Sequence, residues 1–231
     1  MFKQLYFSFV DSDYESEKLL LMVKKFANSE SRIVDVGCGY GRNLRMLINA
    51  GFENVIGVEI NTEIIKENIR RNLPCMSVDE FNSAAENCDV ILMSHVIEHF
   101  SPFNLKEFID GYLDRLNVGG YLVVATPLMS DYFYDDFDHV KPFHPAGILA
   151  VFGIGKAQVQ YYSRNKLTLK DLWFRKSPYR PSYYKEVYLK TRFSRLVQLA
   201  SFLGALIFRL SIRSVGKKDG WIGIFEKVTT V

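Results

Sequence analysis

Three glycines at alternate positions follow a short β-branched run in residues 34–41 (VDVGCGYG). Because glycine has no Cβ, the backbone N–H groups of such a turn can approach a ligand closely. The next apolar run ends at Glu59, where a carboxylate can accept hydrogen bonds from the two hydroxyls of a ribose. Position 42 is Arg42, so the dinucleotide fingerprint G-x-G-x-x-G is not matched. The two segments therefore predict a site for a nucleoside with a short polar tail.

Apolar periodicity along the rest of the chain alternates between strand and helix. Asp11 or Ser12 is expected to cap a first helix that runs through Phe26. The alternation predicts a doubly wound, mostly parallel sheet with helices on both faces, and ligands bind beyond the carboxyl ends of the strands in such sheets. The expected strands are 32–37, 54–59, 75–78, 88–93 and 119–126, and the expected helices are 42–50, 62–71 and 103–115.

Four segments resemble, in their order, motifs of the class I S-adenosylmethionine-dependent methyltransferases. They are VDVGCGYG (34–41), GVEIN (57–61), CDVILMSHVIEH (88–99) and LNVGGYLVVATP (116–127), and the similarity extends over about residues 30–165. Agreement among independent local signals makes the resemblance specific. It implies an α/β, Rossmann-like fold with a seven-stranded sheet, and S-adenosylmethionine as the cofactor. It also implies that a last strand, 221–228, pairs antiparallel at the edge of the sheet.

The resemblance also assigns cofactor contacts. Glu59 would hold the ribose, although an acid at this place can instead cap the next helix. Asp35 would orient the glycine turn and the methionine amino group, directly or through water. Asp79, after the third strand, is either a partner of the adenine amino group or a solvated turn acid. The full set of expected cofactor residues is Asp35, Gly37, Cys38, Gly39, Gly41, Glu59, Ile60, Asp79, Ser94 and His95.

The loop 130–139 follows the fifth strand and alternates aromatic and carboxylate side chains. We expect this loop to overhang the methyl donor. Aromatic rings stack on the C–H faces of sugars and carboxylates accept hydroxyl protons, so the composition suits a polyhydroxylated acceptor. His139 and His144 are the candidate catalytic residues. Each is either a general base, with a pKa near working pH, or an anchor of the loop.

Two histidines four residues apart, His95 and His99, have the spacing of a metal pair on a helix. No third ligand accompanies them in the sequence, and the family uses the resembling stretch to close over the cofactor, so no metal site is expected. A divalent ion in the acidic segment 135–138 is a less common outcome than a solvated loop. The segment 94–97 (SHVI) lacks the Asn/Asp-Pro-Pro-aromatic motif of family members that methylate nucleobase amino groups.

Residues 164–218 contain fourteen Lys and Arg against two Asp and Glu, a net charge of +12, whereas the rest of the chain has a net charge of −9. The family has a short hairpin between its sixth and seventh strands. We therefore expect this chain to depart from the family by a basic, aromatic, helical insertion before the last strand. Apolar residues at three- and four-residue spacing predict a helix over 186–213. The helix either packs on the body, lies on an anionic membrane surface, or binds RNA, and RNA is the least favoured partner.

We therefore expect one domain, 1–231, with an N-terminal helical cap (1–30) and the insertion (164–218). Three scattered cysteines and no recognisable signal peptide indicate a cytoplasmic protein, with peripheral attachment to the inner face of a membrane as a further expectation. The predicted function is methyl transfer from S-adenosylmethionine to an oxygen acceptor, such as a sugar hydroxyl on a lipid-linked or surface glycan. The alternatives are a quinone or lipid ring, RNA, and a non-catalytic nucleoside-binding module.

Overall fold

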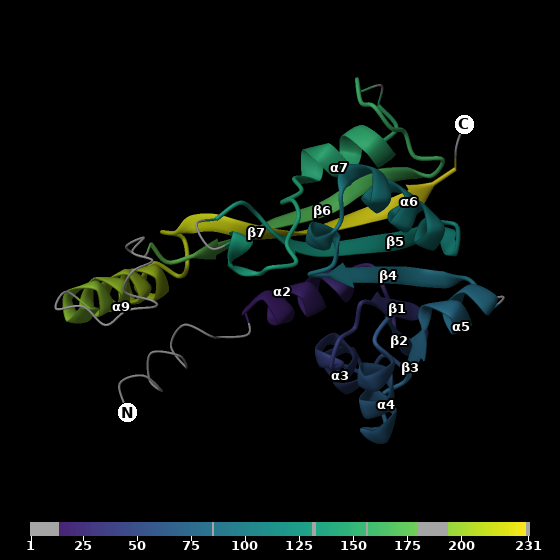
Figure 1. Cartoon of the computed structure of the whole chain (residues 1–231), viewed down its shortest axis with the longest axis horizontal. Helices are drawn as coiled ribbons and strands as arrows, with labels where there is room; N and C mark the ends of the chain where they lie inside the picture. The colour runs from purple at the N-terminus through teal and green to yellow at the C-terminus, as the bar shows by residue number, and fades with distance from the viewer. Residues whose placement is uncertain (1–13, 85, 131–132, 156, 180–193, 230–231) are drawn as a thin grey trace.

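The computed structural model describes residues 14–84, 86–130, 133–155, 157–179 and 194–229. At its centre is a seven-stranded sheet in the order β3-β2-β1-β4-β5-β7-β6 (Figure 1). The strands are β1 (Ile33–Val36), β2 (Val55–Glu59), β3 (Cys75–Ser77), β4 (Cys88–Ser94), β5 (Leu116–Pro127), β6 (Lys166–Ser177) and β7 (Lys217–Val228). Strands β1 to β5 pair in parallel, whereas β7 runs antiparallel to both β5 and β6. The predicted mostly parallel α/β sheet is confirmed.

Helices pack on both faces of this sheet. They are α2 (Tyr14–Val23), α3 (Arg42–Asn49), α4 (Thr62–Arg70), α5 (Val78–Ser83), α6 (Pro102–Leu113) and α7 (Pro145–Phe152), with short 3-10 segments η1 (Ile97–His99) and η2 (Phe133–Asp135). A further helix, α9 (Ser194–Leu210), lies apart from these faces. In β4, Val90 and Leu92 pack with residues of α2 and α3, whereas Ile91 and Met93 pack with residues of α6 and α7. Successive strand side chains point to opposite faces, so a strand covered on both sides is apolar throughout.

Side-chain caps start the helices that follow β2 and β3. The Asn61 side chain accepts hydrogen bonds from two backbone N–H groups in the first turn of α4. Ser77 and Glu80 form a capping box at the start of α5. These polar residues end the apolar strands at the same edge of the sheet. The predicted caps of the first helix, Asp11 and Ser12, lie outside the described residues, and α2 ends at Val23, one turn earlier than expected.

The C-terminal part of the sheet differs from the expectation. The last strand begins at Lys217 and lies between β5 and β6, so it is not the edge strand. The edge strand at this end of the sheet is β6, which occupies the first part of the range 164–218 where a helical insertion is expected. The inserted segment is therefore the shorter stretch between β6 and β7. Its described helix is α9, and residues 186–193 of the predicted helix lie outside the described residues.

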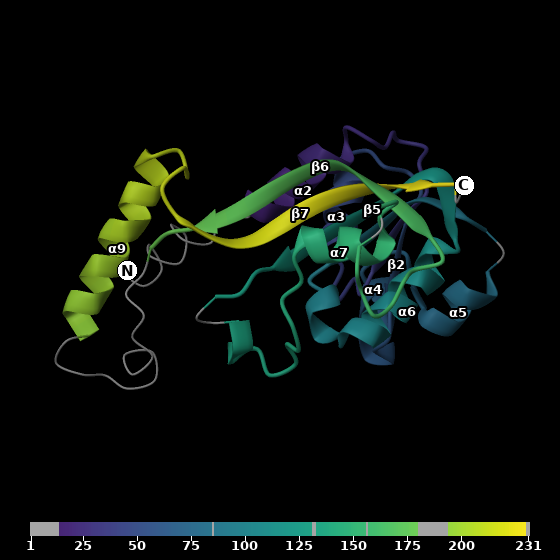
Figure 2. The ribbon, with the colours of Figure 1, turned by 90° about the horizontal axis from the view of Figure 1, so that it is seen from above.

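The ends of β6 and β7 extend beyond the rest of the sheet, and α9 lies at their far end, away from the other helices (Figures 1 and 2). Within α9 only Ser201 and Ala205 are buried. No helix in the described part of the chain is long and apolar enough to cross a membrane.

Several basic residues of the range 164–218 pair with acids of the sheet and its helices. The ion pairs are Arg164–Asp114, Lys170–Glu226 and Arg175–Asp219. Because these cations are neutralised locally, the +12 charge of the range overstates the positive charge that faces outward.

Candidate active site

The predicted cofactor residues of the first two strands lie at one edge of the sheet. Asp35 pairs in register with Gly57, and the backbone N–H of Gly37, just beyond β1, donates to the carbonyl of Val58. The glycine turn and the end of β2 are therefore held side by side. Parallel sheets of this type bind their ligands at this carboxyl edge.

The glycine turn adopts a conformation that other residues rarely reach. Gly37, Gly39 and Gly41 have φ values of 66°, 50° and 72°. A Cβ on Gly39 would meet no atom within 4 Å, so the turn is open on that side. A Cβ on Gly41 would lie 2.5 Å from Leu73 Cδ1, so packing against α4 and β3 also requires glycine there. The turn thus combines a fixed backbone with an open face.

Glu59 fastens the turn to the end of β2. Its Oε2 accepts a hydrogen bond from the N–H of Gly39 at 3.0 Å, and its Oε1 accepts from Ile60 and Asn61 at 2.9 and 3.0 Å. The carboxylate is buried, whereas the Ile60 side chain is 85% exposed. Each carboxylate oxygen has two lone pairs, so Oε2 retains acceptor capacity toward the open side of the turn.

Asp35 is buried and almost without hydrogen bonds. Its Oδ1 lies 3.5 Å from the Asn43 Nδ2 donor, and its Oδ2 has no hydrogen-bond partner among the described residues. Burial raises the pKa of Asp35 to about 7, against weaker lowering effects from Asn43 and Arg42. A buried acceptor that lacks a donor is costly. A ligand that donates a hydrogen bond to this carboxylate would remove that cost.

Two further residues shape the turn. Cys38 is buried and its Sγ lies 3.5 Å from Cys75 Sγ, both thiols being free, which agrees with a small side chain that fills the turn. Asn68, from the last turn of α4, donates through Nδ2 to the Gly39 carbonyl at 2.7 Å. An asparagine in a helix interior has no sequence signal for this role, and only the tertiary structure reveals it.

The end of β4 carries Ser94 and His95. Ser94 Oγ is buried with no hydrogen-bond partner among the described residues. His95 has a positive φ of 57°, uncommon for a residue with a side chain. Its Nε2 lies 2.6 Å from Glu15 Oε1 of α2. Burial tends to lower the pKa of His95, but its contacts with Glu15 and Glu98 raise it to about 9. The ring is therefore a cation held by α2.

Asp79 lies in the first turn of α5, just after β3, and its side chain is exposed. Since Ser77 of β3 pairs in register with Glu59, Asp79 follows the strands at the predicted edge. No contact of its carboxylate distinguishes an adenine partner from a solvated acid, and its role stays a prediction.

On the acceptor side the structure separates the two candidate bases. His139 is partly buried, its Nδ1 lies 2.6 Å from the carbonyl oxygen of Phe133, and its ring centroid lies 5.0 Å from that of His99. His144 is exposed at the start of α7, where its carbonyl accepts from Gly147. His139 therefore lies beside His99, just after the end of β4, whereas His144 is the N-cap residue of α7.

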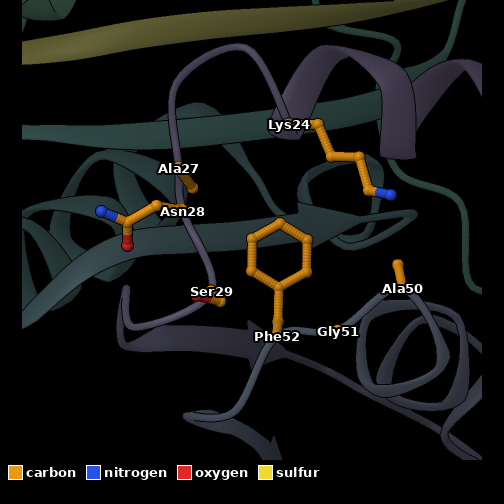
Figure 3. A pocket seen from close by; sticks show the side chains of 7 residues that line it. All are labelled: Lys24, Ala27, Asn28, Ser29, Ala50, Gly51 and Phe52. Atoms are coloured by element: carbon orange, nitrogen blue, oxygen red, sulfur yellow. The ribbon is translucent and has the colours of Figure 1, made fainter.

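Two pockets lie elsewhere on the molecule. One, of about 120 Å³, is formed by Lys24 and residues 27–29 and 50–52, before β1 and β2 and hence at the opposite edge of the sheet from the glycine turn (Figure 3). The other, of about 200 Å³, lies between α5 and α6. Neither is lined by the predicted cofactor residues.

Solved structures share this fold. A SAM-dependent methyltransferase from Archaeoglobus fulgidus aligns over 98% of this chain and 99% of its own, with 18% identity and a TM-score of 0.58. The magnesium protoporphyrin IX methyltransferase of Synechocystis, solved with bound SAM, aligns over 93% of this chain and 77% of its own at 13% identity and a TM-score of 0.52. The cyclase SpnF aligns over 93% and 82%, at 13% identity and a TM-score of 0.56. At such identities the likeness shows the fold alone.

No curated protein matches the chain in sequence. A family model described as a methyltransferase domain matches residues 6–195, which is most of the chain. The chain therefore belongs to the methyltransferase domain family, and the predicted class, the class I S-adenosylmethionine-dependent methyltransferases with S-adenosylmethionine as cofactor, is confirmed.

Proposed function

We propose that this protein transfers the methyl group of S-adenosylmethionine to an oxygen acceptor, with Asp35, Glu59 and the turn 37–41 holding the donor. Three observations support the donor site: the open face at Gly39, the remaining acceptor capacity of Glu59, and the unpartnered Oδ2 of Asp35. The carboxylates suit the ribose hydroxyls and the methionine ammonium. The bound cofactor supplies an electrophilic methyl carbon on a sulfonium, so the protein mainly aligns the acceptor and excludes water.

The proposal of an oxygen acceptor is based on His139, which can accept the proton of a hydroxyl. A hydroxyl holds its proton at neutral pH, and a positioned acceptor for that proton aids transfer. Nδ1 of His139 carries its proton toward the carbonyl of Phe133, so Nε2 is the nitrogen with the free lone pair. This nitrogen lies beside the segment that follows β4. The fixed tautomer of His139 is the single observation on which the oxygen acceptor rests.

A glycan hydroxyl is the acceptor that best suits the neighbouring side chains. Tyr134 and Phe137 are 59% and 98% exposed, and exposed carboxylates of Asp135 and Asp136 stand between them. Exposed rings stack on sugar C–H faces, and carboxylates accept hydroxyl protons. A quinone or other lipid ring would use the same rings without the carboxylates, and it is the second candidate.

Transfer to oxygen can be tested with methyl-labelled donor and cell extract separated into glycolipid, quinone and RNA fractions. We expect an alkali-stable ether on a sugar of the glycolipid fraction. A label on nitrogen, or in the RNA fraction, would contradict the proposal. Donor binding without any transfer would favour a non-catalytic module, and the fold of the cyclase SpnF is a reminder that architecture alone does not fix the reaction.

We further propose that α9 rests on an anionic membrane surface. Its apolar side chains recur at three- and four-residue spacing and are exposed; they are Leu196, Leu199, Leu203, Ile207 and Leu210. Such a contiguous apolar face marks an interaction site. The segment between β6 and β7, residues 178–216, has seven Lys and Arg and one Glu. An apolar face with basic surroundings is the composition of an interfacial helix.

Replacing Leu203 and Ile207 together by serine should weaken binding to anionic vesicles by about thirtyfold or more, since burial of such side chains contributes about 1–2 kcal/mol each when half exposed. Sedimentation with phosphatidylserine-containing vesicles measures this. The matched control replaces Leu21 and Val118, which are 61% and 60% exposed, by serine and should leave binding unchanged. Equal binding of both double variants, or stronger binding to RNA than to vesicles, would refute the membrane proposal.

A further inference from the structure

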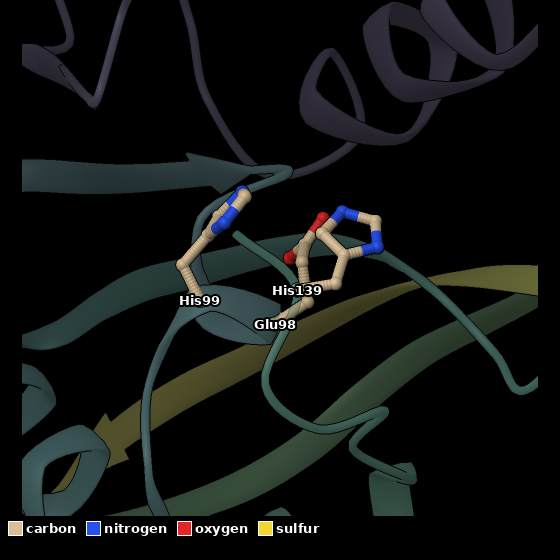
Figure 4. Close-up of side chains that lie close together, drawn as sticks. All are labelled: Glu98, His99 and His139. Atoms are coloured by element: carbon tan, nitrogen blue, oxygen red, sulfur yellow. The ribbon is translucent and has the colours of Figure 1, made fainter. Parts of the chain in front are cut away.

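Three side chains with metal-ligating atoms meet beside the end of β4. The ligand atoms of Glu98, His99 and His139 all lie within 4.8 Å of one another (Figure 4). Glu98 and His99 come from η1, and His139 comes from the loop before α7. Ligands at about 2.0–2.2 Å from one ion lie about 3–4 Å apart, so the side chains need only a small closure to share an ion.

Both histidines are held in the orientation that a metal ligand needs. Nδ1 of His99 lies 3.1 Å from the carbonyl oxygen of Asp138, and Nδ1 of His139 lies 2.6 Å from that of Phe133. A carbonyl only accepts, so each Nδ1 carries the proton and each Nε2 keeps its lone pair. A second-shell carbonyl that fixes the tautomer in this way is a regular partner of metal-bound histidine.

Glu98 provides an independent indication of a ligand. It is fully buried, and its Oε2 accepts from Thr126 Oγ1 at 2.9 Å. Its Oε1 has no hydrogen-bond partner among the described residues, although His95 Nδ1 lies 3.3 Å away. A buried carboxylate is costly unless it is paired or binds a metal, and one oxygen of Glu98 is incompletely satisfied. Thr126 thus holds Oε2, whereas Oε1 faces the His95 cation at 3.3 Å and, with two lone pairs, retains acceptor capacity for a further ligand.

We propose that Glu98, His99 and His139 form a binding site for one divalent metal ion. Two imidazoles and one carboxylate suit zinc, manganese, iron or cobalt, and they leave coordination positions open. Asp136 is a fourth candidate, since its Oδ2 lies 3.6 Å from His139 Nε2. The site departs from the sequence expectation, which paired His99 with His95 and found no third ligand. The third ligand is forty residues away in the sequence, and the fold brings it close.

The role of the ion rests on the proposed function. A hydroxyl bound at an open position loses its proton more readily, because the cation stabilises the oxyanion. The proton passes to Asp136 or to water. The electron pair of the oxygen forms the new bond to the methyl carbon, and the pair of the carbon–sulfur bond returns to sulfur, which leaves as a neutral thioether. His139 would then act as a ligand instead of as the base, the ion would lower the pKa of the hydroxyl, and Asp136 or water would accept the proton.

The test uses the full chain after treatment with a chelator, titrated with Co²⁺ by visible absorption and with Mn²⁺ by calorimetry. We expect one ion per chain and an absorption spectrum typical of histidine-bound Co²⁺. His139→Gln and His99→Gln should each weaken Co²⁺ binding at least tenfold, whereas His144→Gln, outside the cluster, should bind Co²⁺ like the wild type. Binding of S-adenosylhomocysteine by each variant checks that it is folded.

The outcomes separate the site from the reaction. Equal Co²⁺ binding by wild type, His99→Gln and His139→Gln, or no binding by the wild type, overturns the site even when oxygen methylation is observed. Binding of Co²⁺ at the cluster together with labelling of nitrogen keeps the site and overturns the proposed function. Oxygen methylation that stops with the chelator and returns with metal supports both.

Discussion

Replacing Glu59 by alanine should weaken the binding of S-adenosylhomocysteine by about thirty- to a thousandfold. The change removes a charged acceptor for the two ribose hydroxyls, a loss of about 2–4 kcal/mol in binding free energy. It also leaves three backbone N–H groups, of Gly39, Ile60 and Asn61, without their acceptor. Isothermal titration calorimetry measures the affinity, and thermal unfolding without ligand measures the structural part of the effect.

Two further variants separate these contributions. Glu59→Gln keeps the shape and one acceptor oxygen but turns an NH2 group toward a backbone N–H, so its stability and its affinity should both lie between those of wild type and Glu59→Ala. Glu53→Ala removes an exposed acid just before β2 and should change neither property. A folded Glu59→Ala protein with wild-type affinity would mean that the ribose is held elsewhere, and that Glu59 only fastens the turn.

The parallel part of the fold could be predicted because its strands are buried on both faces. β1, β2 and β4 appear in the sequence as mostly apolar runs (IVDV, VIGVE and CDVILMS), and their predicted bounds agree within one residue. β6 was missed for the opposite reason. As an edge strand it mixes apolar residues with basic and other polar ones, and half-buried side chains such as Trp173 and Arg175 resemble part of a basic insertion. Placing β7 inside the sheet depends on that missing strand.

In the candidate site, contacts between residues close in the sequence could be predicted, whereas contacts between residues far apart could not. The glycine turn and Glu59 follow from rules that act within one βαβ unit. The contacts of Asn68 with the turn and of Glu15 with His95 join residues 29 and 80 positions apart, and no local pattern encodes them. The meeting of His99 with His139 is of this second kind. Hence the sequence can predict that the glycine turn and Glu59 lie together, but not which side chains surround His139.

Replacing Asp35 by asparagine should stabilise the free protein at high pH. Burial raises the pKa of Asp35 to about 7 in the folded state, above its ordinary value of 3.8. Below pH 3.8 the carboxyl is protonated in both states, and as the pH rises toward 7 the unfolded chain ionises first, so the wild type loses stability. The neutral amide avoids this loss. The difference of about 3 between the folded and unfolded pKa values corresponds to an expected gain of about 4 kcal/mol at pH 8, with little difference at pH 4, measured by urea unfolding.

The same substitution should weaken donor binding, because the buried carboxylate is the partner of the donor ammonium in the proposed site. In the wild type, affinity for S-adenosylhomocysteine should fall as the pH drops below about 7, up to tenfold per unit, since only the ionised carboxylate attracts the ammonium. Asp35→Asn should bind weakly with a flat pH profile. A buried carboxylate without a hydrogen-bond donor lowers the stability of the free protein. Such a group is expected where a bound ligand supplies the missing donor. If Asp35→Asn is neither more stable at pH 8 nor weaker in binding, the carboxylate has another partner and this part of the donor site is wrong.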